Sequence, residues 1–132
     1  MSNGLKAESC GLTVLRMVVG IVFAMHGWQK IHVFHLAGVT GMLSHLGFPM
    51  PTVFAVILIT VEFLGGILLI TGLATRGPAV LLAVDMLVAI ITMHMKHGFF
   101  ASAGGIELPF TVLGALICLA IAGGGSFSRK GW

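Results

Sequence analysis

The chain has 132 residues, of which 58% are hydrophobic and only 8% charged, and its mean hydropathy is +1.10. A water-soluble domain carries about 25% charged residues, because most of its surface must face water. This composition excludes a soluble globular domain and leaves the lipid bilayer as the solvent. The net charge is +3, but the seven Lys and Arg residues are scattered, with only Arg129 and Lys130 adjacent, and no basic patch interleaved with aromatic residues is present, which argues against nucleic acid as a partner.

The amino-terminal segment and the two cysteines give no sign of secretion or redox chemistry. The first apolar stretch contains Arg16 and lacks a small-residue cleavage site, so we do not expect a cleaved signal peptide. Cys10 and Cys118 form no Cys-x-x-Cys motif. We expect both cysteines to be small buried apolar residues.

Four apolar stretches come near the roughly 20 residues that a helix needs to cross the hydrocarbon region. They cover residues 11–28, 52–73, 78–95 and 108–123. We therefore predict an all-α integral membrane protein, a four-helix bundle that forms a single membrane domain over residues 1–132. An even number of spans places both termini on the same side of the membrane.

The distribution of Lys and Arg predicts which side that is. Cytoplasmic loops of membrane proteins are enriched in these residues. The side of the termini carries four of these residues: Lys6, Arg76, Arg129 and Lys130. Arg16 lies just inside the lipid near that side. Only Lys30 and Lys96 fall on the opposite side. We predict that both termini are cytoplasmic and that the protein is a multi-pass protein of the inner membrane.

The connections between the spans differ in length. Residues 72–77 hold two glycines around a short turn, which predicts that the second and third spans are antiparallel neighbours. Residues 31–50 form a longer connection in which Leu36, Val39 and Leu43 recur at helical spacing. This pattern predicts a short amphipathic helix at the membrane interface. An irregular loop is the alternative.

Ionisable residues within the apolar stretches carry the functional prediction, because each costs a few kcal/mol unless it is paired or hydrated. On the first span, Arg16, Phe23 and Lys30 repeat every seven residues, and His26 lies close to the same line. That face is expected to point into the bundle. On the second span, Glu62 precedes Gly65 and Gly66, which permit close approach of another helix.

The third and fourth spans add further polar positions. On the fourth span, a stripe of small or polar residues predicts an interior face: Glu107, Thr111, Gly114 and Cys118. On the third span, Asp85 lies at a depth similar to that of Arg16, which makes the two natural neighbours. A purely structural network of Arg16 with Asp85 or Glu62 could explain these charges. Alternatively, Glu62, His26 and Glu107 could exchange protons with a ligand between the helices.

Two histidine pairs offer weak candidates for a metal site. They are His32 with His35 and His94 with His97, each three residues apart, a spacing at which two imidazoles on a helix can bind one metal ion. Histidines at membrane interfaces are common without any metal. We therefore expect neither a metal ion nor haem.

Six short motifs, taken together and in order, resemble the DoxX family of small bacterial and archaeal membrane proteins over about residues 12–125. They are Arg16, His26-Gly27-x-x-Lys30, Leu46-Gly47-x-Pro49-x-Pro51, Glu62-x-x-Gly65-Gly66, Gly72-x-x-Thr75-Arg76 and Gly104-Gly105-x-Glu107. The resemblance implies a four-helix membrane bundle and a link to quinone-dependent systems such as thiosulfate:quinone oxidoreductase. Asp85 and the histidine pairs are not part of the shared pattern.

The leading hypothesis is therefore a membrane subunit of a quinone-linked redox system, in which residues between the helices bind a quinone and exchange protons with it. Arg16, His26, Lys30 and Glu62 would bind the quinone, and Glu62, His26 and Glu107 would act catalytically. A non-catalytic anchor or assembly protein for a soluble oxidoreductase is the alternative, and a small-solute permease is a third possibility. A homo-oligomer that completes a cavity fits any of these functions.

Overall fold

The computed structural model describes residues 2–129, and all regular structure in that range is helical. Lys130, which contributes to the predicted charge asymmetry, lies outside the described residues. The elements in chain order are α1 (Asn3–Gln29), the π-helical turn η1 (Lys30–Phe34), α2 (His35–His45), α3 (Pro51–Thr71), α4 (Arg76–Ala89), the π-helical turn η2 (Ile90–His94), the short 3₁₀ turns η3 (Met95–His97) and η4 (Ala101–Ala103), and α5 (Glu107–Ala122).

Three helical stretches are long and apolar enough to cross a membrane: Asn3–His45, Pro51–Thr71 and Arg76–His97. They contain the first three predicted spans. The fourth predicted span is α5, which is apolar but has only 16 residues. At 1.5 Å per residue it measures about 24 Å, somewhat less than the hydrocarbon region. The prediction of an all-helical, multi-pass membrane protein is confirmed.

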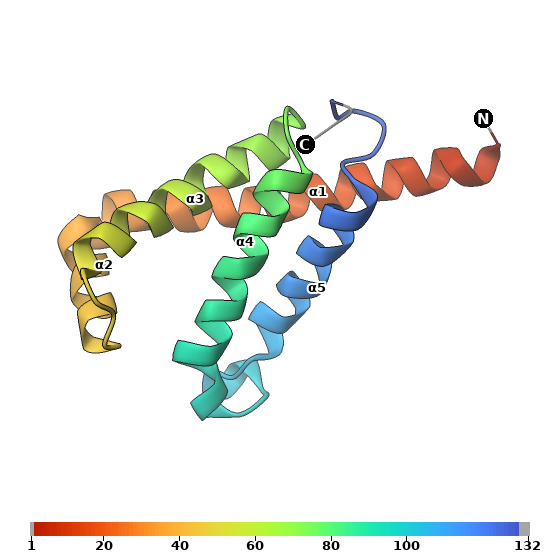
Figure 1. Cartoon of the computed structure of the whole chain (residues 1–132). Helices are drawn as coiled ribbons and strands as arrows, with labels where there is room; N and C mark the ends of the chain where they lie inside the picture. The colour runs from red at the N-terminus through yellow and green to blue at the C-terminus, as the bar shows by residue number, and fades with distance from the viewer. Residues whose placement is uncertain (1, 130–132) are drawn as a thin grey trace.

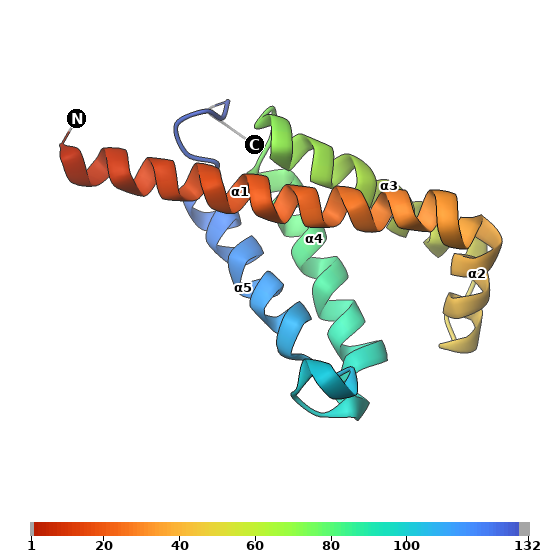
Figure 2. The same cartoon turned by 180° about the vertical axis from the view of Figure 1, so that it is seen from behind.

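The helices are arranged as two antiparallel pairs that diverge from one end of the molecule. Figures 1 and 2 show α1 lying alongside α3, and α4 lying alongside α5. The two pairs meet near the turn between α3 and α4 and then separate, so that the outer ends of α3 and α4 lie far apart. The four long helices therefore do not run side by side along their whole length, as a compact bundle would require.

Glycines bring α1 and α3 into close contact. A Cβ atom added to Gly66 would lie 2.7 Å from the carbonyl oxygen of Gly20, and one added to Gly27 would lie 2.6 Å from the Cβ of Phe63. No side chain fits in such a space, so the two backbones touch. This confirms that the glycines after Glu62 permit close helix approach.

The main hydrophobic core lies where the two pairs meet. Val19 and Phe23 of α1, and Leu69 of α3, pack there against residues of the other pair. Those residues are Ala79, Leu82, Leu116 and Leu119.

The predicted interior stripe of α5 is wrong. Thr111, Gly114 and Cys118 are exposed, and α5 instead buries Leu116 and Leu119 against its neighbours. The Thr111 hydroxyl donates to the carbonyl of Glu107, so this stripe has no need of a polar neighbour and can face lipid. Cys10 is also exposed, so the expectation that both cysteines are buried is wrong as well.

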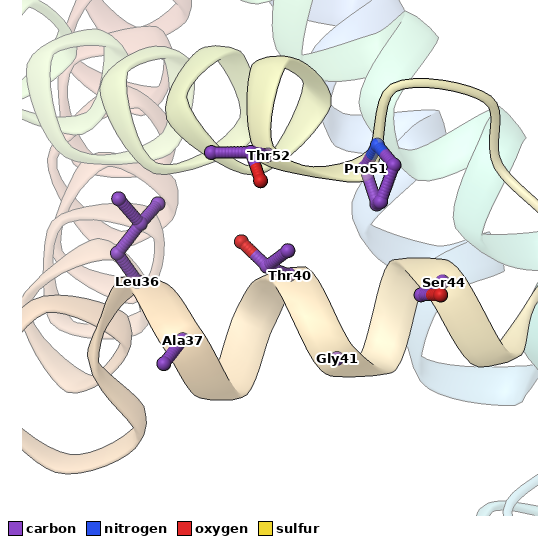
Figure 3. A pocket seen from close by; sticks show the side chains of 7 residues that line it. All are labelled: Leu36, Ala37, Thr40, Gly41, Ser44, Pro51 and Thr52. Atoms are coloured by element: carbon purple, nitrogen blue, oxygen red, sulfur yellow. The ribbon is translucent and has the colours of Figure 1, made fainter.

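The connection between α1 and α3 contains a helix, as the leucine spacing predicts. The chain bends sharply at His35, whose φ of 57° departs from helical geometry, and α2 then packs on the start of α3. Val39 and Leu43 are buried against Ala55 of α3. A hollow of about 660 Å³ remains between α2 and the beginning of α3 (Figure 3). The predicted interfacial position of α2 stays a prediction.

Candidate functional site

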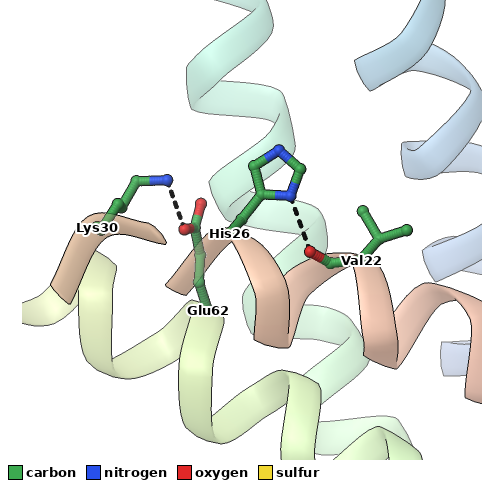
Figure 4. A network of polar contacts seen from close by, with 4 residues as sticks. All are labelled: Val22, His26, Lys30 and Glu62. Carbon is green, nitrogen blue, oxygen red and sulfur yellow. Dashed lines mark hydrogen bonds and ion pairs between the residues drawn. The ribbon is translucent and has the colours of Figure 1, made fainter. Parts of the chain in front are cut away.

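The one ion pair within residues 2–129 joins α3 to the end of α1. The ammonium Nζ of Lys30 lies 2.6 Å from Oε2 of Glu62, and the two side chains are 14% and 5% exposed (Figure 4). Both charges are thus largely removed from solvent within the apolar part of the chain. Each charge compensates the other, and removal of either partner would leave an uncompensated charge in an apolar environment.

Local structure places these two side chains opposite each other. Gly27, one turn before Lys30, packs on Phe63, which is the residue next to Glu62. Lys30 also begins the π-helical turn η1. Turns of this kind inside longer helices are frequent at functional sites. The sequence predicts close helix approach at Gly65 and Gly66, but it predicts neither the contact of Gly27 with Phe63 nor the π turn.

Asp85 on α4 lies beside Glu62. Gly65 of α3 packs against Leu82 of α4, where an added Cβ would lie 3.3 Å from the leucine side chain. Because α3 and α4 are antiparallel, Glu62, three residues before Gly65, lies opposite Asp85, three residues after Leu82. The two carboxyl groups lie within reach of each other, and Lys30 is close enough to act electrostatically on Asp85. The expectation that Asp85 pairs with Arg16 is wrong, because similar depth along two helices does not place two residues on facing surfaces.

His26 stands at the margin of this ionic site. Its Nδ1 lies 2.8 Å from the carbonyl oxygen of Val22, and the imidazole points to the same side of α1 as the Glu62 carboxyl group (Figure 4). A carbonyl oxygen only accepts, so Nδ1 carries the proton and Nε2 of the neutral ring is left as an acceptor. Unlike Glu62, His26 is exposed in the isolated chain.

Arg16 lies elsewhere and bonds to backbone carbonyls. It is 2% exposed, and its Nε donates to Gly124 at 3.0 Å. Its remaining donors reach Leu69 and Ile70 at the end of α3, and Phe127 beyond α5. The guanidinium thus joins α1 to the end of α3 and to the segment after α5. The structure does not bring Arg16 together with Glu62.

Glu107 is likewise distant from the ionic site. Its Oε2 accepts the backbone N–H of Ala101 at 2.8 Å, which closes the turn between η4 and α5. This turn is at the opposite end of α5 from the core where the helix pairs meet. Of the residues predicted to form one site, the structure joins Glu62 and Lys30, places His26 one turn before Lys30 on α1, and adds Asp85.

The two histidine pairs bond mainly to backbone. The Nδ1 atoms of His32 and His35 lie 3.1 Å and 3.0 Å from carbonyl oxygens one turn earlier, and that of His94 lies 2.9 Å from the Gly104 carbonyl oxygen. Among residues 2–129 there is no cluster of three or more side chains from His, Cys, Asp and Glu that could hold a metal ion.

These features define a multi-pass α-helical membrane protein with a small cluster of charges enclosed between its helices. Comparison with known proteins specifies this class further. The family model for DoxX matches residues 11–95, and the chain belongs to the DoxX family.

Bacterial relatives match almost the whole chain. It is 34% identical over 119 residues to a Bacillus subtilis protein named "Putative oxidoreductase CatD", covering 89% of this chain and 83% of the relative. An uncharacterised Haemophilus influenzae protein is 35% identical, with 96% and 92% covered. The inner membrane protein YqjF of Escherichia coli is 28% identical, with 93% and 92% covered. No solved structure matches the chain. The protein is a multi-pass inner-membrane protein, as its composition predicts.

Proposed function

We propose that this protein is a membrane subunit of a quinone-linked redox system and that a quinone binds beside the ionic site formed by Lys30, Glu62 and His26. The observation that carries the proposal is the Lys30–Glu62 ion pair inside an apolar helical protein. Charged side chains in membrane spans are costly, and they commonly mark functional sites. The name of the relative CatD supports an oxidoreductase role.

The residues of the site fit a quinone. Its ring and tail are apolar and its two carbonyl oxygens need hydrogen-bond donors, while the reduced form must release protons. Lys30 offers an ammonium group, and His26 offers an Nε2 atom that accepts in the neutral ring and donates in the charged one. When bound, the quinone would supply the electron-accepting chemistry. Glu62 would hold Lys30 in place and exchange protons with the site.

The position of the site favours access from the bilayer. His26 is exposed, and its exposed neighbours Val22 and Met25 on α1 are apolar. Glu62 lines neither the hollow between α2 and α3 nor a second one of about 170 Å³, which is lined by Val61, Gly65 and other residues of α3 and α4. A lipid-soluble ligand could therefore approach His26 laterally between the diverging helix pairs.

A non-catalytic anchor for a soluble oxidoreductase is the second candidate. It is favoured by the way in which both buried cations join helices: Arg16 ties α1 to α3 and to the carboxy-terminal segment, and Lys30 ties the end of α1 to α3. Under this function the charges only stabilise the fold. The oxidoreductase partner and a homo-oligomer stay predictions.

Quinone binding by the purified protein tests the first proposal. Full-length protein in detergent or nanodiscs is titrated with ubiquinone and menaquinone analogues. We expect saturable binding that is weakened about tenfold or more by Glu62→Gln and by Lys30→Met, because loss of one charged hydrogen bond is worth about 1.5–3 kcal/mol.

Exposed residues of the same type supply the matched controls. Glu8→Gln and Lys6→Met make the same chemical changes at exposed positions of α1 and should leave quinone affinity unchanged. Absence of saturable binding by the unaltered protein would refute the quinone site. A Glu62→Gln protein that is less stable but binds quinone normally would favour the anchor.

A further inference from the structure

Asp85 is a half-buried acidic residue that the proposed quinone site does not use. Its Oδ2 atom is shielded from solvent and has no hydrogen-bond partner within residues 2–129. Its carboxyl group faces that of Glu62 across the contact between α3 and α4, and the packing of Gly65 on Leu82 one turn away fixes this register. An unpaired buried carboxylate oxygen in a span is costly and calls for an explanation.

The charges in this cluster do not balance. If both carboxyl groups ionise, Glu62 and Asp85 contribute two negative charges and Lys30 only one positive charge. His26 is the remaining titratable group near them, and its Nδ1 is committed to the Val22 carbonyl. On the neighbouring elements η2 and α5, the titratable side chains have other partners: His94 bonds to the Gly104 carbonyl oxygen and Glu107 to the backbone N–H of Ala101. A net negative charge would then remain in the apolar interior.

One proton resolves both problems. A proton on Asp85 removes the excess charge and lets Asp85 donate a hydrogen bond to one oxygen of Glu62. The other oxygen of Glu62, Oε2, keeps its contact with Lys30. Two carboxyl groups that share a site cannot readily both ionise. A hydrogen bond between a carboxylic acid and a carboxylate is also stronger than one between neutral groups.

We propose that Glu62 and Asp85 form a proton-holding carboxyl pair, in which one proton is bound between α3 and α4 and Lys30 neutralises the remaining charge. This pair is a binding site for a proton, and it exists whether or not a quinone binds. It makes Asp85 a functional residue of the family member described by this sequence, although Asp85 lies outside the motifs that the chain shares with the DoxX pattern.

Infrared spectroscopy of the quinone-free protein tests the pair directly. A protonated carboxyl group gives a C=O stretching band that is separate from carboxylate bands and shifts in D₂O. We expect this band in the unaltered full-length protein in nanodiscs at pH 7, and its loss in Asp85→Asn. The matched control Glu8→Gln, at an exposed position, should retain the band. Absence of the band in the unaltered protein, or its persistence in Asp85→Asn, would overturn the proposal.

Combined substitutions provide a second readout. Glu62→Gln alone leaves Asp85 to ionise beside Lys30, and Asp85→Asn alone leaves Glu62 to do so, so each single variant should keep an unfolding midpoint close to that of the unaltered protein. The double variant leaves Lys30 without a counter-ion and should unfold at a clearly lower temperature, and adding Lys30→Met should restore it. A double variant as stable as the singles would contradict the pair.

A bound cation is the outcome to be distinguished. If Na⁺ or K⁺ occupied the site in place of the proton, either salt would raise the unfolding midpoint of the unaltered protein but not of Asp85→Asn, and the infrared band would be missing. That result would overturn the proposal. Because no measurement here uses quinone, failure of the quinone titration leaves the carboxyl pair standing, and failure of the pair leaves quinone binding to be judged by its own titration.

Discussion

Single buried residues of this protein show how a charge can be tolerated in an apolar environment in two ways. Lys30 and Glu62 neutralise each other, whereas Arg16 has only backbone carbonyls as partners. Carbonyl groups at the end of a helix carry partial negative charge and have no partner within the helix. The end of α3 therefore forms a natural site for a cation, and no carboxylate is needed for Arg16.

Replacement of Arg16 should be severely destabilising. Arg16→Met leaves buried carbonyls of Leu69 and Gly124 without donors, and we expect a loss of about 3 kcal/mol or more in the free energy of unfolding. Arg129→Met, which removes an exposed arginine, is the matched control and should cost less than about 0.5 kcal/mol. Unfolding in mixed detergent micelles measures both. Equal losses in the two variants would show that the carbonyl contacts of Arg16 contribute little.

At the level of helices, the contact between α1 and α3 positions the ionic site. Gly20, Gly27 and Gly66 let the backbones touch along the contact, so that Lys30 at the end of α1 reaches Glu62 in the middle of α3. In lipid, such contacts are stabilised by close packing and not by the hydrophobic effect. The precision of the site therefore depends on the absence of side chains at these glycines.

A methyl group at Gly66 should disturb both the contact and the site. In Gly66→Ala the added Cβ would collide with the backbone of Ala24 and with the Gly20 carbonyl oxygen, and we expect a loss of about 1–3 kcal/mol in stability together with weaker quinone binding. Gly114→Ala on α5 is the control, because its Cβ would meet nothing within 4 Å. The unfolding midpoint and the quinone titration of the two variants test this. A Gly66→Ala protein as stable as Gly114→Ala would contradict the close contact.

At the scale of the whole molecule, the segment after α5 lies between the first part of α1 and the turn between α3 and α4. The backbone N–H of Arg129 donates to Gly72 at 2.8 Å, and Ser126 bonds to Ser9 of α1. The cations Lys6, Arg76 and Arg129 belong to these segments. The sequence analysis assigns Lys30 to the opposite side, but the charge of Lys30 is neutralised by Glu62. The difference between the two sides in unpaired positive charge is therefore larger than the sequence alone indicates.

This arrangement predicts a cytoplasmic location for both termini. In a background of Cys10→Ser and Cys118→Ser, we expect Ser102→Cys in η4 to react with a membrane-impermeant maleimide on intact spheroplasts. Ser2→Cys should react only in inverted vesicles. The reverse pattern of labelling would show that the protein has the opposite orientation, and labelling of both sites from one side would contradict the three spans predicted between residues 2 and 102.

The sequence by itself determined the solvent, the helical class, the approximate spans and the family. Hydropathy and length decide these features locally, because in lipid every backbone group must be satisfied within its own segment. The seven-residue repeat on the first span also identified its buried face, since Arg16 and Phe23 are both buried. Gly65 and Gly66, three and four residues after Glu62, likewise predicted a face of close helix contact, and Glu62 is buried on it.

Only the tertiary structure decided which polar groups meet. Asp85 faces Glu62 and not Arg16, because the partner of each residue depends on the register between helices that are distant in sequence, and depth in the membrane does not encode that register. The outward stripe of α5 was mistaken for an interior face because small residues suit either environment once Thr111 bonds to its own helix. The divergence of the two helix pairs likewise depends on where backbones can touch, which is a property of pairs of surfaces and not of any single segment.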